Sequence, residues 1–186
     1  MSSNYWQTEK IRLRAVEPED APAFYEWNLD SEQARALDFV WPPSSMASVR
    51  AWTLEQSTRK LEDDRFVWVI ETRQGVAVGA IDTHHCERRT GTFRYGIVIG
   101  RPHRKRGYAS AAIQLVLRYY FEELRYQKVT VDVHSYNTSS IDLHEQLGFT
   151  LEGTLRRMGY TRGAYFDIHW YGMTAEEFLA RAPQVQ

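Results

Sequence analysis

The length, composition and charge of the chain limit what it can be. Its 186 residues, 43% of them hydrophobic, suffice for one domain with a sizeable core, whereas two domains of half that length would each be marginal. A formal net charge of −1 gives no global field that would attract nucleic acid or an anionic membrane. One cysteine and no apolar run of 18 residues argue against a disulfide framework and a membrane span, so we expect a cytoplasmic protein.

In chain order, the first half of the sequence predicts a strand, two helices and three strands. Residues 11–16 alternate apolar and polar side chains, as a half-buried strand does, and the acids and proline of residues 17–20 predict a helix start. Two sets of spaced residues predict the buried sides of the helices: Ala21, Phe24, Tyr25 and Leu29, then Val49, Trp52, Thr53 and Gln56. Runs rich in β-branched and aromatic residues predict the strands Phe66–Ile70, Val76–Ile81 and Thr92–Ile99.

The second half predicts a helix, a strand, another helix and a closing pair of strands. Apolar residues between Ala109 and Leu124 follow the i, i+3, i+4, i+7 spacing of an amphipathic helix. A later helix, capped by Asn137 or Ser139, ends at Gly148. The strands are predicted at Val129–Val133, Phe149–Leu155 and Phe166–Met173. This order predicts one α/β (α+β) domain around a mixed sheet.

The most informative segment is the basic turn that joins the strand Thr92–Ile99 to the amphipathic helix. Free N–H groups at a helix start, together with the helix dipole, form an anion site, and Gly107 lets the main chain approach a ligand closely. Five basic residues surround this turn: Arg101, His103, Arg104, Lys105 and Arg106. A solvated basic loop and a nucleic-acid patch are alternative interpretations, but a Walker-type loop is excluded because no Gly-Lys-Ser/Thr follows.

Two patterns in the sequence resemble a known enzyme family. Arg104-Lys105-Arg106-Gly107-Tyr108-Ala109 resembles the Arg/Gln-x-x-Gly-x-Gly/Ala signature of the GNAT acetyltransferases. Asn137-x-x-Ser140, followed by Gly148-Phe-x-x-Glu-Gly153, resembles the RimJ/RimL-like branch of that family. The resemblance implies a GNAT fold, a single domain with a central mixed, mostly antiparallel, twisted sheet with splayed strands, flanked by about four helices. We place this N-acetyltransferase domain at residues 9–176 and a C-terminal tail at 177–186.

The resemblance also implies a reaction. An acetyl-CoA-dependent N-acetyltransferase would transfer the acetyl group by direct attack of a primary amine, from a protein N-terminus, a polyamine or another small amine. The backbone of Ile97 and Ile99 would pair with the pantetheine amides, and Asn137 would contact the pantetheine arm. The turn residues would hold the pyrophosphate: Arg104, Lys105, Arg106, Gly107, Tyr108, Ala109 and Ser110. RimL-like relatives imply a homodimer. The alternative is a catalytically silent GNAT domain that binds acyl-CoA as a sensor or assembly module.

The proton donor to the leaving thiolate is where the chain departs from the wider family. His144 stands where many relatives have a tyrosine, and Ser140, one helical turn earlier on the same face, matches the serine proposed in RimL-like enzymes. In the other interpretation Ser140 only packs or caps, His144 faces solvent, and water carries the proton. The glutamate base of RimL-like enzymes aligns near Gly159, which leaves weaker candidates: Asp82, His84, Tyr95 and Asp167.

Two further clusters carry less weight. Residues 84–87 contain two histidines and a cysteine, but adjacent strand residues point to opposite faces, so we expect no metal site. Five acidic residues near the expected acceptor side would suit a cationic amine or simply form a solvated helix face: Glu17, Asp20, Glu26, Asp30 and Asp38.

Overall fold

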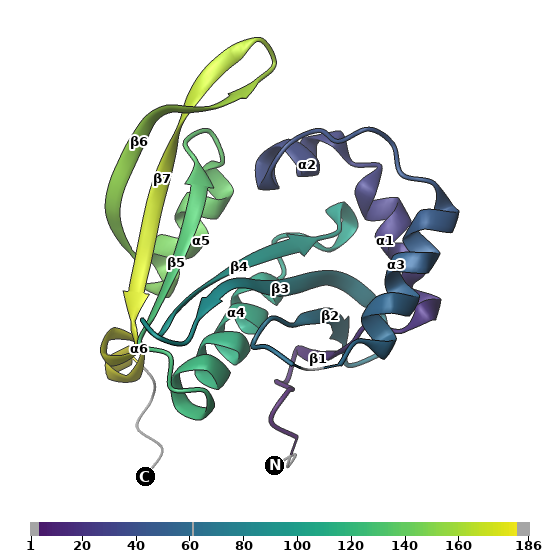
Figure 1. The fold of residues 1–186 in the computed structure, drawn as a ribbon, viewed down its shortest axis with the longest axis horizontal. Helices are drawn as coiled ribbons and strands as arrows, with labels where there is room; N and C mark the ends of the chain where they lie inside the picture. The colour runs from purple at the N-terminus through teal and green to yellow at the C-terminus, as the bar shows by residue number, and fades with distance from the viewer. Residues whose placement is uncertain (1–3, 61, 182–186) are drawn as a thin grey trace. The chain divides into compact units, whose positions relative to one another are not determined.

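The computed structural model describes residues 4–60 and 62–181, and its strands form one seven-stranded mixed sheet (Figure 1). The strand order is β1-β2-β3-β4-β5-β7-β6, with β4 and β5 parallel. The strands are β1 (Ile11–Ala15), β2 (Val67–Thr72), β3 (Ala77–Glu87), β4 (Thr92–Ile99), β5 (Lys128–His134), β6 (Thr150–Thr161) and β7 (Ala164–Thr174). The predicted mixed-sheet α/β fold is therefore confirmed.

Six α-helices accompany the sheet in the described residues. They are α1 (Ala21–Asn28), α2 (Ser31–Leu37), α3 (Met46–Thr58), α4 (Tyr108–Arg118), α5 (Thr138–Leu147) and α6 (Ala175–Arg181). Short 3-10 turns, η1 (Pro18–Asp20) and η2 (Arg101–His103), precede α1 and follow β4, and a π-helical turn, η3 (Tyr119–Glu123), follows α4. None of the helices in these residues is both long and apolar enough to cross a membrane.

The chain divides into two compact units, and the first comprises the chain through Thr83 together with Gly96–Leu115. Its core lies where α1 and α3 pack beside each other and against the strands (Figure 1). The buried members of this core are Val16, Ala21, Phe24, Val49, Val69 and Ala80. Alternation places Ile11 and Leu13 of β1 inside and Arg12 outside, as the sequence pattern predicts.

An ion-pair network ties β1 and β2 to the turn η1 within this unit. The Arg14 guanidinium donates to both oxygens of Asp20, at 2.7 and 2.8 Å, and to Glu71 Oε1 at 2.7 Å. Arg12 reaches the other oxygen of Glu71. The Asp20 and Glu71 side chains are both 8% exposed. The network therefore holds two carboxylates that would otherwise be buried without compensation.

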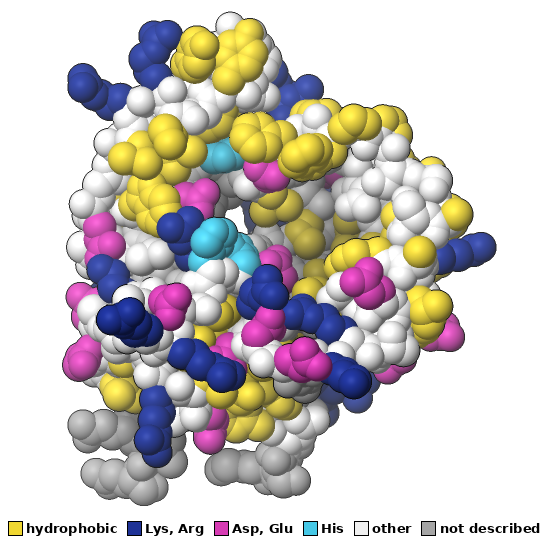
Figure 2. Space-filling view, viewed as in Figure 1, with side chains coloured by type: hydrophobic (Ala, Val, Ile, Leu, Met, Phe, Trp, Pro, Cys, Tyr) yellow, Lys and Arg dark blue, Asp and Glu magenta, His cyan; other side chains and the backbone are white. Residues whose placement is uncertain are grey.

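The second unit comprises His84–Tyr95 and the chain from Val116 onward. Its core is aromatic: the Phe93 and Tyr120 rings stack at 4.0 Å, and the Phe121 and Tyr126 rings meet Phe93 edge-on. The hairpin of β6 and β7 contains two register shifts on β6, and most β6 side chains are exposed. Apolar side chains at the hairpin end lie beside basic ones in Figure 2. The exposed large apolar residues of the hairpin are Leu151, Leu155, Met158, Tyr160 and Tyr165.

Two details of the predicted elements are wrong. Leu29 does not belong to the buried side of the first helix, because α1 ends at Asn28 and Leu29 is 55% exposed. The sequence also predicts no helix at α2, a short segment whose apolar positions are few. Residues 177–181 lie in α6, which continues directly from β7, and residues 182–186 of the expected tail lie outside the described residues.

Candidate functional site

The turn between β4 and α4 presents a series of backbone N–H groups. Lys105 and Gly107 both have positive φ, 60° and 79°, which folds the chain back before α4 begins at Tyr108. Within the described residues, the backbone amides of Lys105 and of Gly107 to Ser110 donate no backbone hydrogen bond, and the first bonded amide of α4 is Ala111, which donates to the Gly107 carbonyl. Such a run of available donors at a helix start is an anion site.

Lys10 lies against the same turn. A Cβ built on Gly107 would lie 3.1 Å from Lys10 Nζ, so this ammonium group stands beside the glycine. Sequence reasoning missed Lys10, because it precedes β1 and only the fold brings it next to a turn almost a hundred residues later. A phosphate bound to the turn would find a cation there.

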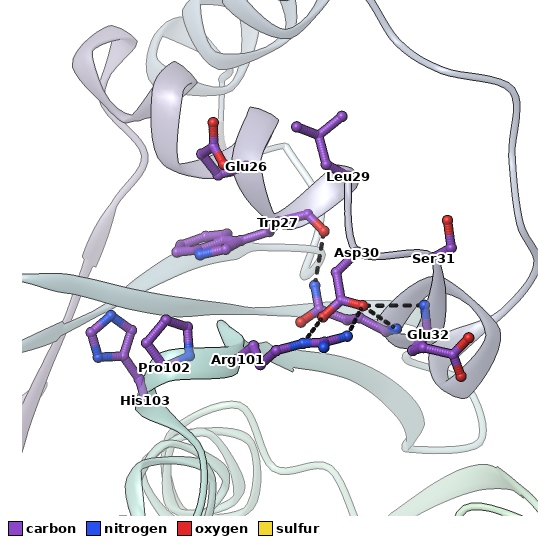
Figure 3. A pocket seen from close by; sticks show the side chains of 10 residues that line it. Glu26, Trp27, Leu29, Asp30, Ser31, Glu32, Arg101, Pro102 and His103 are labelled. Carbon is purple, nitrogen blue, oxygen red and sulfur yellow. Dashed lines mark hydrogen bonds and ion pairs between the residues drawn. The ribbon is translucent and has the colours of Figure 1, made fainter.

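Two arginines of the turn are engaged with the start of α2 rather than free for a ligand. Arg101 donates to Asp30 at 2.8 and 3.1 Å, and Figure 3 shows its guanidinium directed at that carboxylate. Arg104 donates to Gln33 Oε1 at 2.7 Å and to the Ile99 carbonyl at 3.0 Å. The Arg101 hydrogen bond lowers the pKa of Asp30, which also caps α2 by accepting from two of its amides. These contacts orient the turn relative to α2.

A pocket of about 600 Å³ opens beside these contacts (Figure 3). Its walls come from the end of α1, the start of α2 and η2, and include Trp27, Leu29, Glu26 and His103. Of the five acids considered from the sequence, Asp20 is paired with Arg14, Asp30 with Arg101, and Asp38 accepts from the Trp41 indole. Two of these five acids, Glu26 and Asp30, line the pocket.

The last residues of β4 present backbone groups on one edge. The Val98 carbonyl faces β3, since a Cβ on Gly79 would lie 2.1 Å from it, and the Gly100 amide donates to the Val78 carbonyl. By strand alternation, the amides and carbonyls of Ile97 and Ile99 face away from β3. The Ile99 carbonyl already accepts from Arg104, which reduces the groups left for a ligand there.

In the second unit, Asn137 caps α5. Its side-chain oxygen accepts from the Ser140 amide at 3.2 Å, which confirms the predicted cap, and Gly148 ends the helix with φ of 92°. The cap orients the first turn of α5, on which Ser140 lies.

Ser140, His144 and Tyr95 form a hydrogen-bonded chain in the same unit. His144 Nδ1 lies 2.7 Å from the Ser140 carbonyl oxygen and 3.3 Å from Ser140 Oγ, and His144 Nε2 lies 2.8 Å from the Tyr95 hydroxyl. His144 is 3% exposed, so the interpretation in which it faces solvent is wrong. Burial lowers the pKa of His144, against the opposing hydrogen bond to Ser140, and burial raises the pKa of Tyr95. Burial therefore favours the neutral form of the imidazole.

The position of Gly159, near which the glutamate base of RimL-like enzymes aligns, has no room for a side chain. A Cβ on Gly159 would lie 2.1 Å from the Phe166 ring, which occupies that position across the hairpin. Asp167 instead accepts from the Arg157 amide at 2.7 Å. In the described parts of the chain, no three His, Cys, Asp or Glu side chains gather as metal ligands, and within residues 84–87 His85 has a positive φ.

Comparisons with known proteins bear on this arrangement. A family model described as an acetyltransferase (GNAT) domain matches residues 10–150. The SPbeta prophage-derived uncharacterized N-acetyltransferase YokL of Bacillus subtilis is 43% identical over 178 residues, 96% of this chain and 97% of that protein. The spermidine N(1)-acetyltransferase of Escherichia coli K12 is 26% identical over 171 residues, 91% of this chain and 89% of that protein.

Solved structures share the fold. A spermidine N-acetyltransferase from Vibrio cholerae, in complex with CoA and spermine, superposes with a TM-score of 0.81 at 20% identity, covering 92% of this chain and 99% of that one. Proteins of the GNAT family use acetyl-CoA, and the available amides at the start of α4 fit its pyrophosphate. The chain therefore belongs to the GNAT acetyltransferase family and is an N-acetyltransferase, an enzyme that transfers an acetyl group to an amine.

Proposed function

We propose that this enzyme is a RimJ/RimL-like acetyltransferase that binds acetyl-CoA through the turn Arg104–Ser110 and acetylates a primary amine. The observation that carries the proposal is the run of amides from Gly107 to Ser110, together with that of Lys105, which donate no backbone hydrogen bond in the described residues. These amides hold the pyrophosphate, and Lys10 adds a positive charge beside them. Ile97, Ile99 and Asn137 contact the pantetheine arm through their backbone edge and side-chain amide.

Ser140 is the proton donor in this proposal. The neutral amine attacks the thioester carbonyl carbon, the C–N bond forms and the C–S bond breaks as the tetrahedral adduct collapses. Ser140 Oγ–H gives its proton to the departing thiolate, and the proton released by the acetylated nitrogen returns to Ser140 through water. The burial of His144 favours Ser140 over His144 as the donor, because both imidazole nitrogens are already engaged inside the fold.

The acceptor is a cationic aliphatic amine that enters the pocket beside α1 and α2. Trp27 and Glu26 line this pocket, and an aromatic ring and a carboxylate both attract ammonium groups. Spermidine acetyltransferases among the relatives agree with a polyamine, whereas a putative ribosomal N-acetyltransferase of Bacillus subtilis, 26% identical, agrees with a protein N-terminus. We favour the polyamine because the Glu26 carboxylate lines this pocket of about 600 Å³ and would attract a second ammonium group.

Acetylation of an amine panel tests this function. The panel contains spermidine, free amino acids and peptides with different N-termini, with CoA release measured for each. We expect the polyamine to give the highest kcat/KM and Glu26→Gln to raise its KM without changing the KM of acetyl-CoA. Higher kcat/KM for the peptides would contradict the acceptor but not the reaction.

Three further features complete the proposal. The acetyltransferase domain spans residues 9–176, the protein acts in the cytoplasm, and it forms a homodimer. The exposed apolar side chains of the β6–β7 hairpin offer a surface for a second copy. Sedimentation of a single species of 21.8 kDa at micromolar concentration would contradict the dimer.

A further inference from the structure

Tyr95 is a buried tyrosine for which the proposed reaction has no role so far. It lies in β4, is 6% exposed, and its hydroxyl meets His144 Nε2 at 2.8 Å. Among the described residues this imidazole nitrogen is the one hydrogen-bonding partner of the Tyr95 hydroxyl. A phenol can donate to an imidazole nitrogen or accept from it, so the direction of this bond follows from the other contacts of His144.

The contacts of His144 define its tautomer. Nδ1 lies 2.7 Å from the Ser140 carbonyl oxygen, which can only accept, so Nδ1 must carry a hydrogen. In a neutral ring Nε2 then holds a lone pair, to which the Tyr95 O–H can donate. In the opposite tautomer, with the hydrogen on Nε2, the lone pair of Nδ1 would face the Ser140 carbonyl oxygen at 2.7 Å. The Tyr95 hydroxyl hydrogen would then have no acceptor on the imidazole.

This tautomer also orients Ser140. His144 Nδ1 lies 3.3 Å from Ser140 Oγ. Because Nδ1 carries a hydrogen in this tautomer, it has no lone pair that could accept from the hydroxyl. The Ser140 hydroxyl therefore cannot donate to His144, and its hydrogen is directed elsewhere. A hydroxyl that protonates a leaving thiolate needs its hydrogen free in this way.

The other rings around His144 do not compete for its nitrogens. Phe149 meets the imidazole edge-on at 5.1 Å, and Tyr171 stacks on it at 6.2 Å. The Tyr171 hydroxyl donates to Glu145 Oε1 at 3.1 Å, away from the imidazole. Tyr171 thus provides a matched control, a phenol against the same ring with its hydrogen bond elsewhere.

We propose that Tyr95 is a positioning residue, which holds His144 as the Nδ1–H tautomer and so keeps the Ser140 hydroxyl hydrogen free for the leaving thiolate. This inference rests on the proposed role of Ser140. Tyr95 touches no substrate in this account and acts only through His144.

The tautomer can be measured directly by ¹⁵N NMR of the histidine side chains in the full-length protein, with His144→Gln used for assignment. We expect Nδ1 of His144 to be protonated and Nε2 to be an acceptor. In Tyr95→Phe, which keeps the ring, the Nε2 signal should move toward that of a nitrogen without a donor. In Tyr171→Phe it should stay in place. A wild-type His144 protonated at Nε2 would overturn the inference, whatever the activities of the variants.

Kinetics tests the consequence of the tautomer. Tyr95→Phe should lower kcat about tenfold, as expected for one lost buried hydrogen bond, with the KM of acetyl-CoA unchanged. Tyr171→Phe should lower it less. His144→Asn, which keeps a donor near the Nδ1 position, should retain more activity than His144→Gln. Equal kcat values for Tyr95→Phe and Tyr171→Phe would overturn the inference.

A double-mutant cycle separates this inference from the proposed function. If Tyr95 acts through Ser140, Tyr95→Phe should cost no further activity in a Ser140→Ala background, and an additive loss would overturn the inference. An unchanged kcat in Ser140→Ala alone would instead refute Ser140 as the proton donor. That failure of the proposed function can be told apart from a failure of this inference, because ¹⁵N NMR measures the His144 tautomer of the wild type independently of activity.

Discussion

Gly107 lies at the phosphate turn with a backbone angle that favours glycine. Its φ of 79° is one that residues with a Cβ rarely adopt, and a Cβ there would approach Lys10 Nζ to 3.1 Å. Gly107→Ala should lower the free energy of unfolding by about 1 kcal/mol and weaken CoA binding at least tenfold, because the turn would lose its shape and Lys10 would be displaced. Isothermal titration calorimetry with CoA measures the affinity.

Gly75 gives this prediction a matched control. It lies in the turn between β2 and β3 with φ of 81°, and nothing lies within 4 Å of a Cβ built there. Gly75→Ala should therefore cost a similar free energy of unfolding and leave CoA affinity unchanged. Equal affinities in the two variants would place the pyrophosphate elsewhere.

At the level of single residues, the sequence predicted the site where contacts are local and missed it where they are not. The Asn137 cap and the Ser140–His144 contact follow from helical spacing, which links residues three and four apart. The Tyr95–His144 bond joins residues 49 apart, and no spacing rule predicts it. Sequence spacing likewise does not predict that Lys10 lies beside Gly107, because only the fold brings these two residues together.

At the level of elements, the sequence was most accurate where pattern and environment agree. The strand predicted at Thr92–Ile99 has the same bounds as β4, because it is rich in β-branched and aromatic residues and is bordered by a turn on each side. The helix α2 was missed because its stability comes from outside its pattern: Asp30 caps it, and Gln33 binds Arg104. A short polar segment held by such contacts shows no amphipathic spacing.

The cap of α5 allows two roles of Asn137 to be separated. Asn137→Asp keeps an oxygen that accepts from the Ser140 amide but replaces the amide NH₂ with a carboxylate. We expect unchanged stability with a higher KM for acetyl-CoA, because the donor to the pantetheine arm is lost. Asn137→Ala should raise this KM as well and lower the free energy of unfolding by about 1 kcal/mol. A wild-type KM in Asn137→Asp, measured beside thermal unfolding, would leave Asn137 with the cap alone.

At the scale of the whole molecule, acid stability should depend on the Arg14 network. Burial opposes ionisation of Asp20 and Glu71, but hydrogen bonds from Arg14 outweigh it and lower the pKa of both carboxyls. The Glu17 amide helps to lower the pKa of Asp20 below its ordinary value of 3.8. Arg12 helps to lower the pKa of Glu71 below its ordinary value of 4.5. In this range the unfolded chain binds more protons than the folded one. The stabilisation is therefore complete above about pH 4.5 and is lost as pH falls through the folded-state pKa values.

Denaturant unfolding between pH 3 and pH 7 measures this dependence. The free energy of unfolding should fall as the pH drops below about 4.5, and Arg14→Ala should lower it at pH 7 by about 1.5–3 kcal/mol, the usual range for hydrogen bonds to charged groups. The same variant should flatten the acid dependence, because Asp20 and Glu71 lose the partner that lowers their pKa. Asp63→Asn is the control: its carboxylate also pairs with arginines but is 38% exposed, and solvent screens such pairs. An acid profile for Arg14→Ala that parallels the wild type would show that other groups govern the loss of stability.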